Sequence, residues 1–247
     1  MISAKDLGPD FEPVEAPLPR FRHRGLGVEF ALVPGGTFEM GYRDLDRAAL
    51  EALLPIDPPL RAAFERLERE ARPVREVTIA PFLVAALPLR VEQVRRVPGY
   101  EQAVDTFTRQ GALGLARAAN MRLPSEAELE WLAREGGRFS FVSNGAQRHR
   151  NRLTVAMVGP WGVQKLVAGE WAADDWHDSY AGAPLDGRAW LDGGEGGVSR
   201  GALPFGIDQD EHEIALALAC HRARGEQTEA HDRGRLPLRL ALDLPLR

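Results

Sequence analysis

The sequence predicts an α+β fold with much irregular structure, and three observations lead to this prediction. Short runs of β-branched or alternating apolar residues are separated by segments with helical periodicity. The region 139–201 shows no regular periodicity and is rich in Gly, Asp, Asn and Trp. With 44% hydrophobic and 27% charged residues, the 247-residue chain has the composition of a globular protein.

The N-terminal part divides into a leader, a strand pair and a helical insert. Residues 1–24 are rich in proline and charge, and we expect an extended leader before a single domain that covers 25–247. Residues 28–41 alternate apolar positions around a Pro-Gly-Gly sequence, which predicts two short strands joined by a tight turn. In 44–71 apolar residues recur every three or four positions, and the prolines at 55–59 are expected to split this insert into two helices.

Further strands and one helix follow. β-branched residues predict a strand at 74–83, and the composition of 236–244 predicts a final strand. The segment 100–119 is expected to hold a helix that breaks near Gly111 and Gly114.

Another helix, after the one in 100–119, is predicted in 121–137. Ser125 lies three residues before Glu128, which is the spacing of a capping box, and Gly136-Gly137 are typical of a helix end. The loop-rich region beyond it should pack on its own aromatic core, because an exposed tryptophan is costly. Four of the five tryptophans lie in that region: Trp161, Trp171, Trp176 and Trp190.

Composition excludes several classes of protein. The formal net charge of −5 gives no overall attraction to nucleic acid. No apolar run of about 18 residues is present, so no membrane span is expected. The N-terminus lacks the apolar core of a signal peptide, and the expected compartment is the cytoplasm. The one cysteine, Cys220, cannot form an internal disulfide and is expected to be a small buried hydrophobe.

In their order along the chain, several motifs resemble those of the formylglycine-generating enzyme family, also called the sulfatase-modifying-factor domain. The most specific is RLPSEAELEW at 122–131, which is close to the family signature R-L-P-T-E-A-E-W-E-[YW]. The weaker ones are VPGGTFEMG at 33–41, GEW at 169–171, VSRG at 198–201 and RLA at 239–241. The resemblance covers about 25–244 and implies a single C-type-lectin-like domain, with a helical insert near 44–71.

Metal-dependent activities of this family place demands that the sequence does not meet. Its oxidases bind copper through a pair of cysteines near the C-terminus, since thiolates suit Cu(I), and this chain has one cysteine. Its sulfoxide synthases hold iron with three histidines that belong mainly to an extra helical domain with an H-x-x-x-E-x-H motif, which is missing here. A copper-oxidase mechanism is therefore not expected.

Calcium is the remaining cofactor that the resemblance implies. Family members often hold it through oxygen ligands around a G-N-V-W-E-W sequence, where this chain reads Leu166-Val167 in place of Gly-Asn. Glu170 is retained, and Asp174 and Asp175 add carboxylates nearby. The alternative is that the aspartates cap turns.

These points favour a pseudoenzyme: a binding or assembly module without redox activity that recognises a protein partner or ligand through its C-terminal loops. Long loops on a rigid core suit such a role, and aromatic and arginine side chains dominate binding hot spots. By analogy, the partner would be a protein of a bacterial multi-component system, and neither nucleic acid nor a membrane is expected. The candidate contact residues are Trp171, Trp176, His177, Arg200, Phe205, Asp208, Asp210 and His212.

Two other functions stay open. One is an iron- or copper-dependent oxygenase-type enzyme of the same superfamily, with acid/base chemistry drawn from His177, Asp174, Asp175 and His212. The other is a structural subunit of a bacterial complex, in which the helical insert docks on another component.

Overall fold

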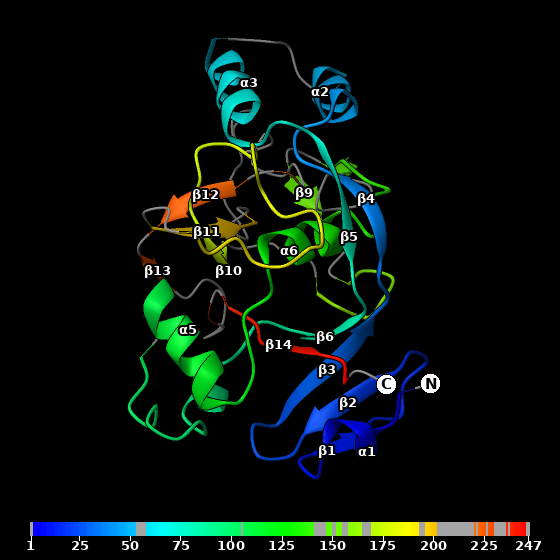
Figure 1. Ribbon diagram of the computed structural model, residues 1–247, viewed down its shortest axis with the longest axis vertical. Helices are drawn as coiled ribbons and strands as arrows, with labels where there is room; N and C mark the ends of the chain where they lie inside the picture. The colour runs from blue at the N-terminus through cyan, green and yellow to red at the C-terminus, as the bar shows by residue number, and fades with distance from the viewer. Residues whose placement is uncertain are drawn as a thin grey trace.

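The computed structural model shows a mixed α+β arrangement with antiparallel sheets, as the sequence predicts (Figure 1). It describes residues 2–52, 58–104, 106–140, 147–149, 152–154, 158–164, 169–192, 196–201, 220, 222–225, 227–229, 236 and 238–245. The helices in these ranges are α1 (Ala4–Leu7), α2 (Asp44–Glu51), α3 (Pro58–Glu70), α4 (Val91–Val94), α5 (Arg109–Ala118) and α6 (Glu126–Ala133).

The largest sheet is antiparallel and joins both ends of the chain. Its strands, in spatial order, are β1 (Phe11–Pro13), β2 (Arg20–His23), β3 (Val28–Val33), β6 (Phe82–Ala85) and β14 (Ala241–Asp243). The final strand expected at 236–244 is therefore shorter than its sequence pattern. The segment 1–24, expected as a leader, supplies α1 and two strands of this sheet. Phe11 and Phe21 are buried in the same apolar cluster as Phe30 of β3, so apolar packing holds the segment 1–24 against the rest of the domain.

The strand pair expected at 28–41 is present, but its two strands do not pair with each other. β3 pairs with β6, and β4 (Gly36–Met40) pairs with β5 (Arg75–Ile79) in a separate two-stranded sheet. Likewise, the strand expected at 74–83 is divided into β5 and β6. Pro34 and Pro81 lie at the two opposing breaks, and neither can donate a backbone hydrogen bond, so both chains leave one sheet and enter the next at the same level.

The remaining strands form three small antiparallel sheets. One contains β10 (Glu170–Asp175), β11 (Gly197–Arg200) and β12 (Arg222–Gly225), in that order. The others are the pairs β7 (Thr106–Thr108) with β13 (Gln227–Glu229), and β8 (Gln147–His149) with β9 (Arg152–Thr154).

The helical insert is confirmed as two helices, which lie together at one end of the molecule (Figure 1). Helix α3 begins at Pro58, a residue that suits the first turn of a helix because it lacks an N–H that would have no partner there. Helix α5 differs from expectation, since it continues through Gly111 and Gly114. A Cβ at Gly114 would lie 2.6 Å from the Tyr100 hydroxyl, so this glycine permits close packing and does not break the helix.

Two apolar clusters form the core. One lies around α6 and the sheet of β4 and β5, and it contains the fully buried Cys220, as expected for a lone cysteine. The other lies between the five-stranded sheet and α5, and it contains Trp171. Among the described residues, no helix is both long and apolar enough to cross a membrane.

We predict that Gly35→Ala destabilises the fold. A Cβ at Gly35 would press on the Ile79 carbonyl oxygen and lie 2.8 Å from the Pro81 ring, at the point where the paired chains bend. Such overpacking should lower the free energy of unfolding in urea by about 1–3 kcal/mol. The control is Gly25→Ala, whose Cβ would meet its nearest atom at 3.5 Å. Equal stability of the two variants would contradict this account of the bend.

Candidate functional site

Helix α6, built by the RLPSEAELEW motif, lies at the centre of the molecule and is buried along its whole length (Figure 1). Its start is the predicted capping box: the Ser125 hydroxyl accepts from the Glu128 N–H at 3.1 Å, and the Ser125 N–H donates to the Glu128 carboxylate at 2.8 Å. The cap fixes the direction in which Glu126 and Glu130 enter the core.

Glu126 and Glu130 bind buried guanidinium groups from β11 and β12. Arg200 donates to Glu126 at 2.8 Å and to Glu130 at 2.7 Å, so it bridges the two carboxylates. Arg222 pairs with Glu126 at 2.7 Å, and the Tyr180 hydroxyl donates to the same carboxylate at 2.7 Å. Burial by itself raises the pKa of Glu126, but the charges of Arg222 and Arg200 outweigh it and hold the pKa below its ordinary value.

The same helix also anchors the helical insert. Arg134 donates to Glu130 at 2.7 Å and to Asp46 of α2 at 2.8 Å, and all three side chains are fully buried. Arg43 adds a second guanidinium to Asp46 at 2.9 Å. Burial alone raises the pKa of Asp46, but the hydrogen bonds and charge of Arg134 outweigh it and lower the pKa overall. We call Asp46, Glu126, Glu130, Arg134, Arg200 and Arg222 the buried charge network.

Asp174 connects this network to a loop. Its carboxylate accepts from the backbone N–H of Glu126 at 2.6 Å and from that of Trp190 at 2.9 Å. Burial, followed by the negative charge of Glu126, raises the pKa of Asp174 to about 7. A carboxyl group that titrates near neutral pH therefore joins α6 to the segment around Trp190.

The three carboxylates expected for calcium each face a donor of the protein. Glu170 is held by the guanidinium of Arg239, with one contact of 2.6 Å, and Asp175 pairs with Arg109 at 2.8 Å. Asp174 caps backbone groups, as the alternative reading expects. In the part of the chain that the structure describes, no three His, Cys, Asp or Glu side chains form a group suited to a metal ion. The calcium site stays a prediction.

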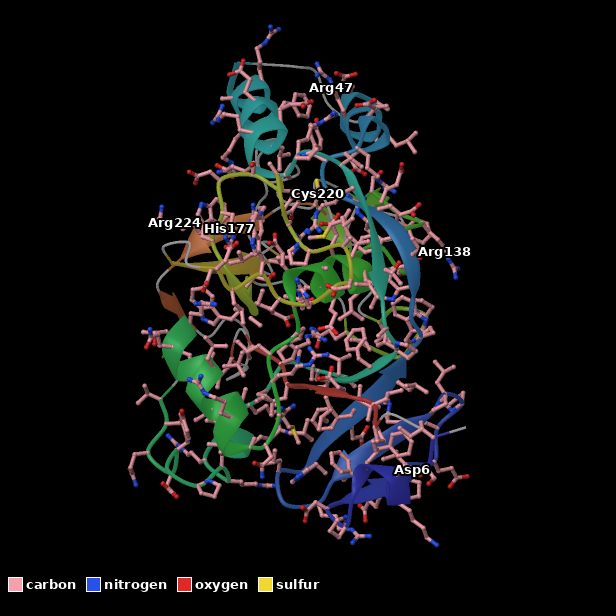
Figure 2. All side chains as sticks on the ribbon, viewed as in Figure 1. Asp6, Arg47, Arg138, His177, Cys220 and Arg224 are labelled. Atoms are coloured by element: carbon pink, nitrogen blue, oxygen red, sulfur yellow. The ribbon has the colours of Figure 1, made fainter. Side chains whose placement is uncertain are left out.

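A surface hollow lies beside the buried charge network, with His177 and Arg224 at the same edge of the molecule (Figure 2). We call it the aromatic hollow. Its volume is about 470 Å³. The residues that line it are Trp176, His177, Asp178, Ser179, Ala181, Trp190 and Arg224.

Contacts from several sides fix the aromatic walls of this hollow. The His177 ring stacks on Trp190 with 3.5 Å between centroids and 4° between planes. Its Nε2 lies 2.6 Å from the Asp192 carboxylate and its Nδ1 lies 3.1 Å from the Asp175 carbonyl oxygen, so both ring nitrogens face acceptors. Hydrogen bonds from Trp190, and then from His177, hold the pKa of Asp192 below its ordinary value.

Trp176 forms the wall nearest the core. Its indole N–H donates to Asp178 at 2.9 Å, and the Arg222 guanidinium lies 4.3 Å from its ring centroid. Arg222 also donates to the His177 carbonyl oxygen at 2.8 Å. One arginine of the buried charge network therefore positions two walls of the aromatic hollow.

The structure brings together some of the contact residues expected from sequence. Trp176 and His177 line the aromatic hollow, whereas Trp171 and Arg200 are fully buried and are not surface anchors. The Trp171 indole N–H donates to the Phe107 carbonyl oxygen at 3.0 Å, and Arg200 serves Glu126 and Glu130. Four expected residues lie outside the described part of the chain: Phe205, Asp208, Asp210 and His212.

Sequence reasoning missed Trp190, Asp192 and Arg224 as parts of this site. The available signal was a tryptophan two residues before an aspartate in a glycine-rich loop, where a large aromatic side chain needs a stacking partner. Nothing in the local pattern pointed to Arg224, which comes from a distant strand.

No protein-family model and no curated protein sequence matches this chain. Among solved structures, PvdO from Pseudomonas aeruginosa is similar, with a TM-score of 0.60 and 20% identity over 92% of this chain and 99% of that one. Treponema denticola variable protein 1 is also similar, with a TM-score of 0.57 and 12% identity over 96% of this chain and 100% of that one. These likenesses support a fold related to the one that the motifs imply. At such identities they carry no activity over.

We predict that Glu126→Gln strongly destabilises the protein. The substitution leaves Arg200 and Arg222 buried with less opposing charge, which should lower the free energy of unfolding by about 3–5 kcal/mol. The control is Glu12→Gln, which breaks an exposed pair with Arg24 and should cost less than about 1 kcal/mol. Chemical unfolding of both variants measures the difference. Similar losses in the two would show that the buried charge network does not organise the core.

We also predict that Asp174 makes stability fall as pH rises toward neutrality. Because its pKa is about 7 in the folded protein and 3.8 as a free side chain, the folded state binds more protons between these values. The carboxyl carbon of Asp174 should titrate near pH 7 in NMR spectra. Relative to Asp174→Asn, the wild type should lose up to about 1.4 kcal/mol per pH unit between about pH 5 and 7. A constant difference between the two proteins would contradict this assignment.

Proposed function

We propose that this chain is a non-catalytic binding or assembly module of the formylglycine-generating-enzyme type, which recognises a partner protein at the aromatic hollow and through its C-terminal loops. The observation that carries the proposal is the aromatic hollow itself. Trp176, His177 and Trp190 meet Arg224 on one concave surface, and aromatic and arginine side chains supply most binding energy at protein interfaces.

The stiffness of the hollow supports recognition. His177 is stacked on Trp190 and bonded at both ring nitrogens, and Trp176 lies between Asp178 and Arg222. Side chains that are already held in place lose little conformational entropy when a partner binds. Strand β12, which bears Arg224, pairs with β11 in the same small sheet, so this wall of the hollow also belongs to regular structure.

The acidic side chains near the site are already bound to other groups of the protein, which supports a function without redox catalysis. Glu126 and Glu170 are bound to buried arginines, and Asp174 is bound to backbone N–H groups. These carboxylates therefore serve the fold. The single cysteine is buried within the core, and burial raises the pKa of its thiol. Assignment to the formylglycine-generating enzyme family rests on the RLPSEAELEW motif and the related fold.

Site-specific photo-crosslinking tests the proposal. We would place a benzophenone amino acid at Ala181, which is exposed and lines the aromatic hollow, and at Arg61 on α3 as the control, in cells that make the protein. A discrete crosslinked partner is expected from position 181 and not from position 61. Trp190→Ala should weaken binding of that purified partner by about 30-fold, as hot-spot truncations do, and Trp190→Phe should weaken it less.

Two results would contradict this function. One is an affinity for the partner that Trp190→Ala leaves unchanged although the variant is folded. The other is aerobic oxidation of a cysteine-containing peptide by the purified chain, which would favour a metal-dependent enzyme. Metal analysis of the same preparation, with and without His177→Ala, would then identify the ion and show whether His177 holds it.

A further inference from the structure

We propose that a second cavity, on the other side of the Trp190 segment, binds a small amphiphilic carboxylate. This side cavity lies between α5, the segment that leads into α6, residues 186–191 and β14, and its volume is about 420 Å³. Volumes of this order are typical of small-molecule sites. The proposal does not rest on partner binding at the aromatic hollow.

The walls of the side cavity are largely apolar. Helix α5 contributes Leu113 and the buried Ala116, and the segment before α6 contributes Met121 and Leu123. Leu191 also lines the cavity and is 63% exposed, so a large apolar side chain is left in water here. A ligand with an apolar body would cover that surface and be stabilised by about 25 cal/mol for each Å² removed from water.

The charged side chains of this cavity differ in whether a carboxylate already holds them. Three carboxylates line the cavity, and each is paired with an arginine that also lines it. Arg122 binds Glu128 at 2.6 Å and Asp243 at 2.7 Å, and Arg188 lies 3.5 Å from Asp186.

Arg117 lines the cavity too, at the exposed side of α5. Within the part of the chain that the structure describes, no ion pair joins its guanidinium to a carboxylate. Of the three arginines in the lining, it is the one that no described carboxylate holds. The planar guanidinium fork matches a carboxylate, to which it donates two parallel hydrogen bonds. An apolar body with one terminal carboxylate satisfies both the walls and Arg117.

Binding of octanoate, octan-1-ol and acetate to the full chain, measured by calorimetry or ligand-observed NMR, tests the proposal. Octanoate should bind about tenfold more tightly than octan-1-ol, since a charge-assisted hydrogen bond contributes that much, and acetate should not bind. Arg117→Gln should lower the affinity for octanoate to that for octan-1-ol and leave octan-1-ol unchanged. Arg61→Gln on α3 is the matched surface control and should change neither affinity.

A filled cavity gives an independent test of the location. Ala116→Leu places a larger side chain in the apolar wall and should abolish octanoate binding, with folding checked by near-UV circular dichroism. If that variant does not fold, Ala189→Phe fills the cavity from the loop side. The proposal is overturned if octanoate and octan-1-ol bind equally to the wild type, if Arg117→Gln keeps the full affinity for octanoate, or if a folded cavity-filled variant binds as the wild type does.

Discussion

The bridge that Arg200 makes between Glu126 and Glu130 is the interaction on which the rest of this structure depends. It joins two carboxylates one helical turn apart on α6 to a strand 70 residues further along the chain. Charges with no access to water are tolerated only when they are paired and hydrogen-bonded. The position of β11 relative to α6 is therefore fixed by charge as well as by apolar packing, and Arg134 fixes α2 in the same way through Asp46.

Side chains also hold the irregular segments, where few backbone ladders exist. The indole N–H of Trp131 donates to the Pro34 carbonyl oxygen at 3.1 Å. The Ser125 hydroxyl donates to the Gly187 carbonyl oxygen at 2.6 Å. Each bond gives a loop carbonyl oxygen a side-chain donor from α6 or its N-cap. A chain with short strands can thus keep a rigid core, because tryptophan and serine donors replace strand pairing at the points where loops enter it.

Local patterns predicted the elements whose causes are local. The capping box at Ser125 and the proline-bounded start of α3 depend on residues within one or two turns, and both are present. Partners far apart in sequence carry no local signal. The separate sheets of β3 and β4, and the burial of Arg200 away from the surface, follow from pairing across tens of residues. From sequence alone, Arg200 was predicted to lie at the surface, because nothing local indicates that Glu126 and Glu130 bind it in the core.

The aromatic hollow and the side cavity share the segment around Trp190, and this segment is bound to the core through Asp174. Trp190 lines the aromatic hollow, while its neighbours Ala189 and Leu191 line the side cavity. The backbone of Trp190 is bound on both sides to β10, through the Asp174 carboxylate and the Asp175 N–H. A carboxyl with a pKa of about 7 gains its charge beside Glu126 in the neutral range. The charge of Asp174 therefore changes at the point where the shared segment is bound to β10.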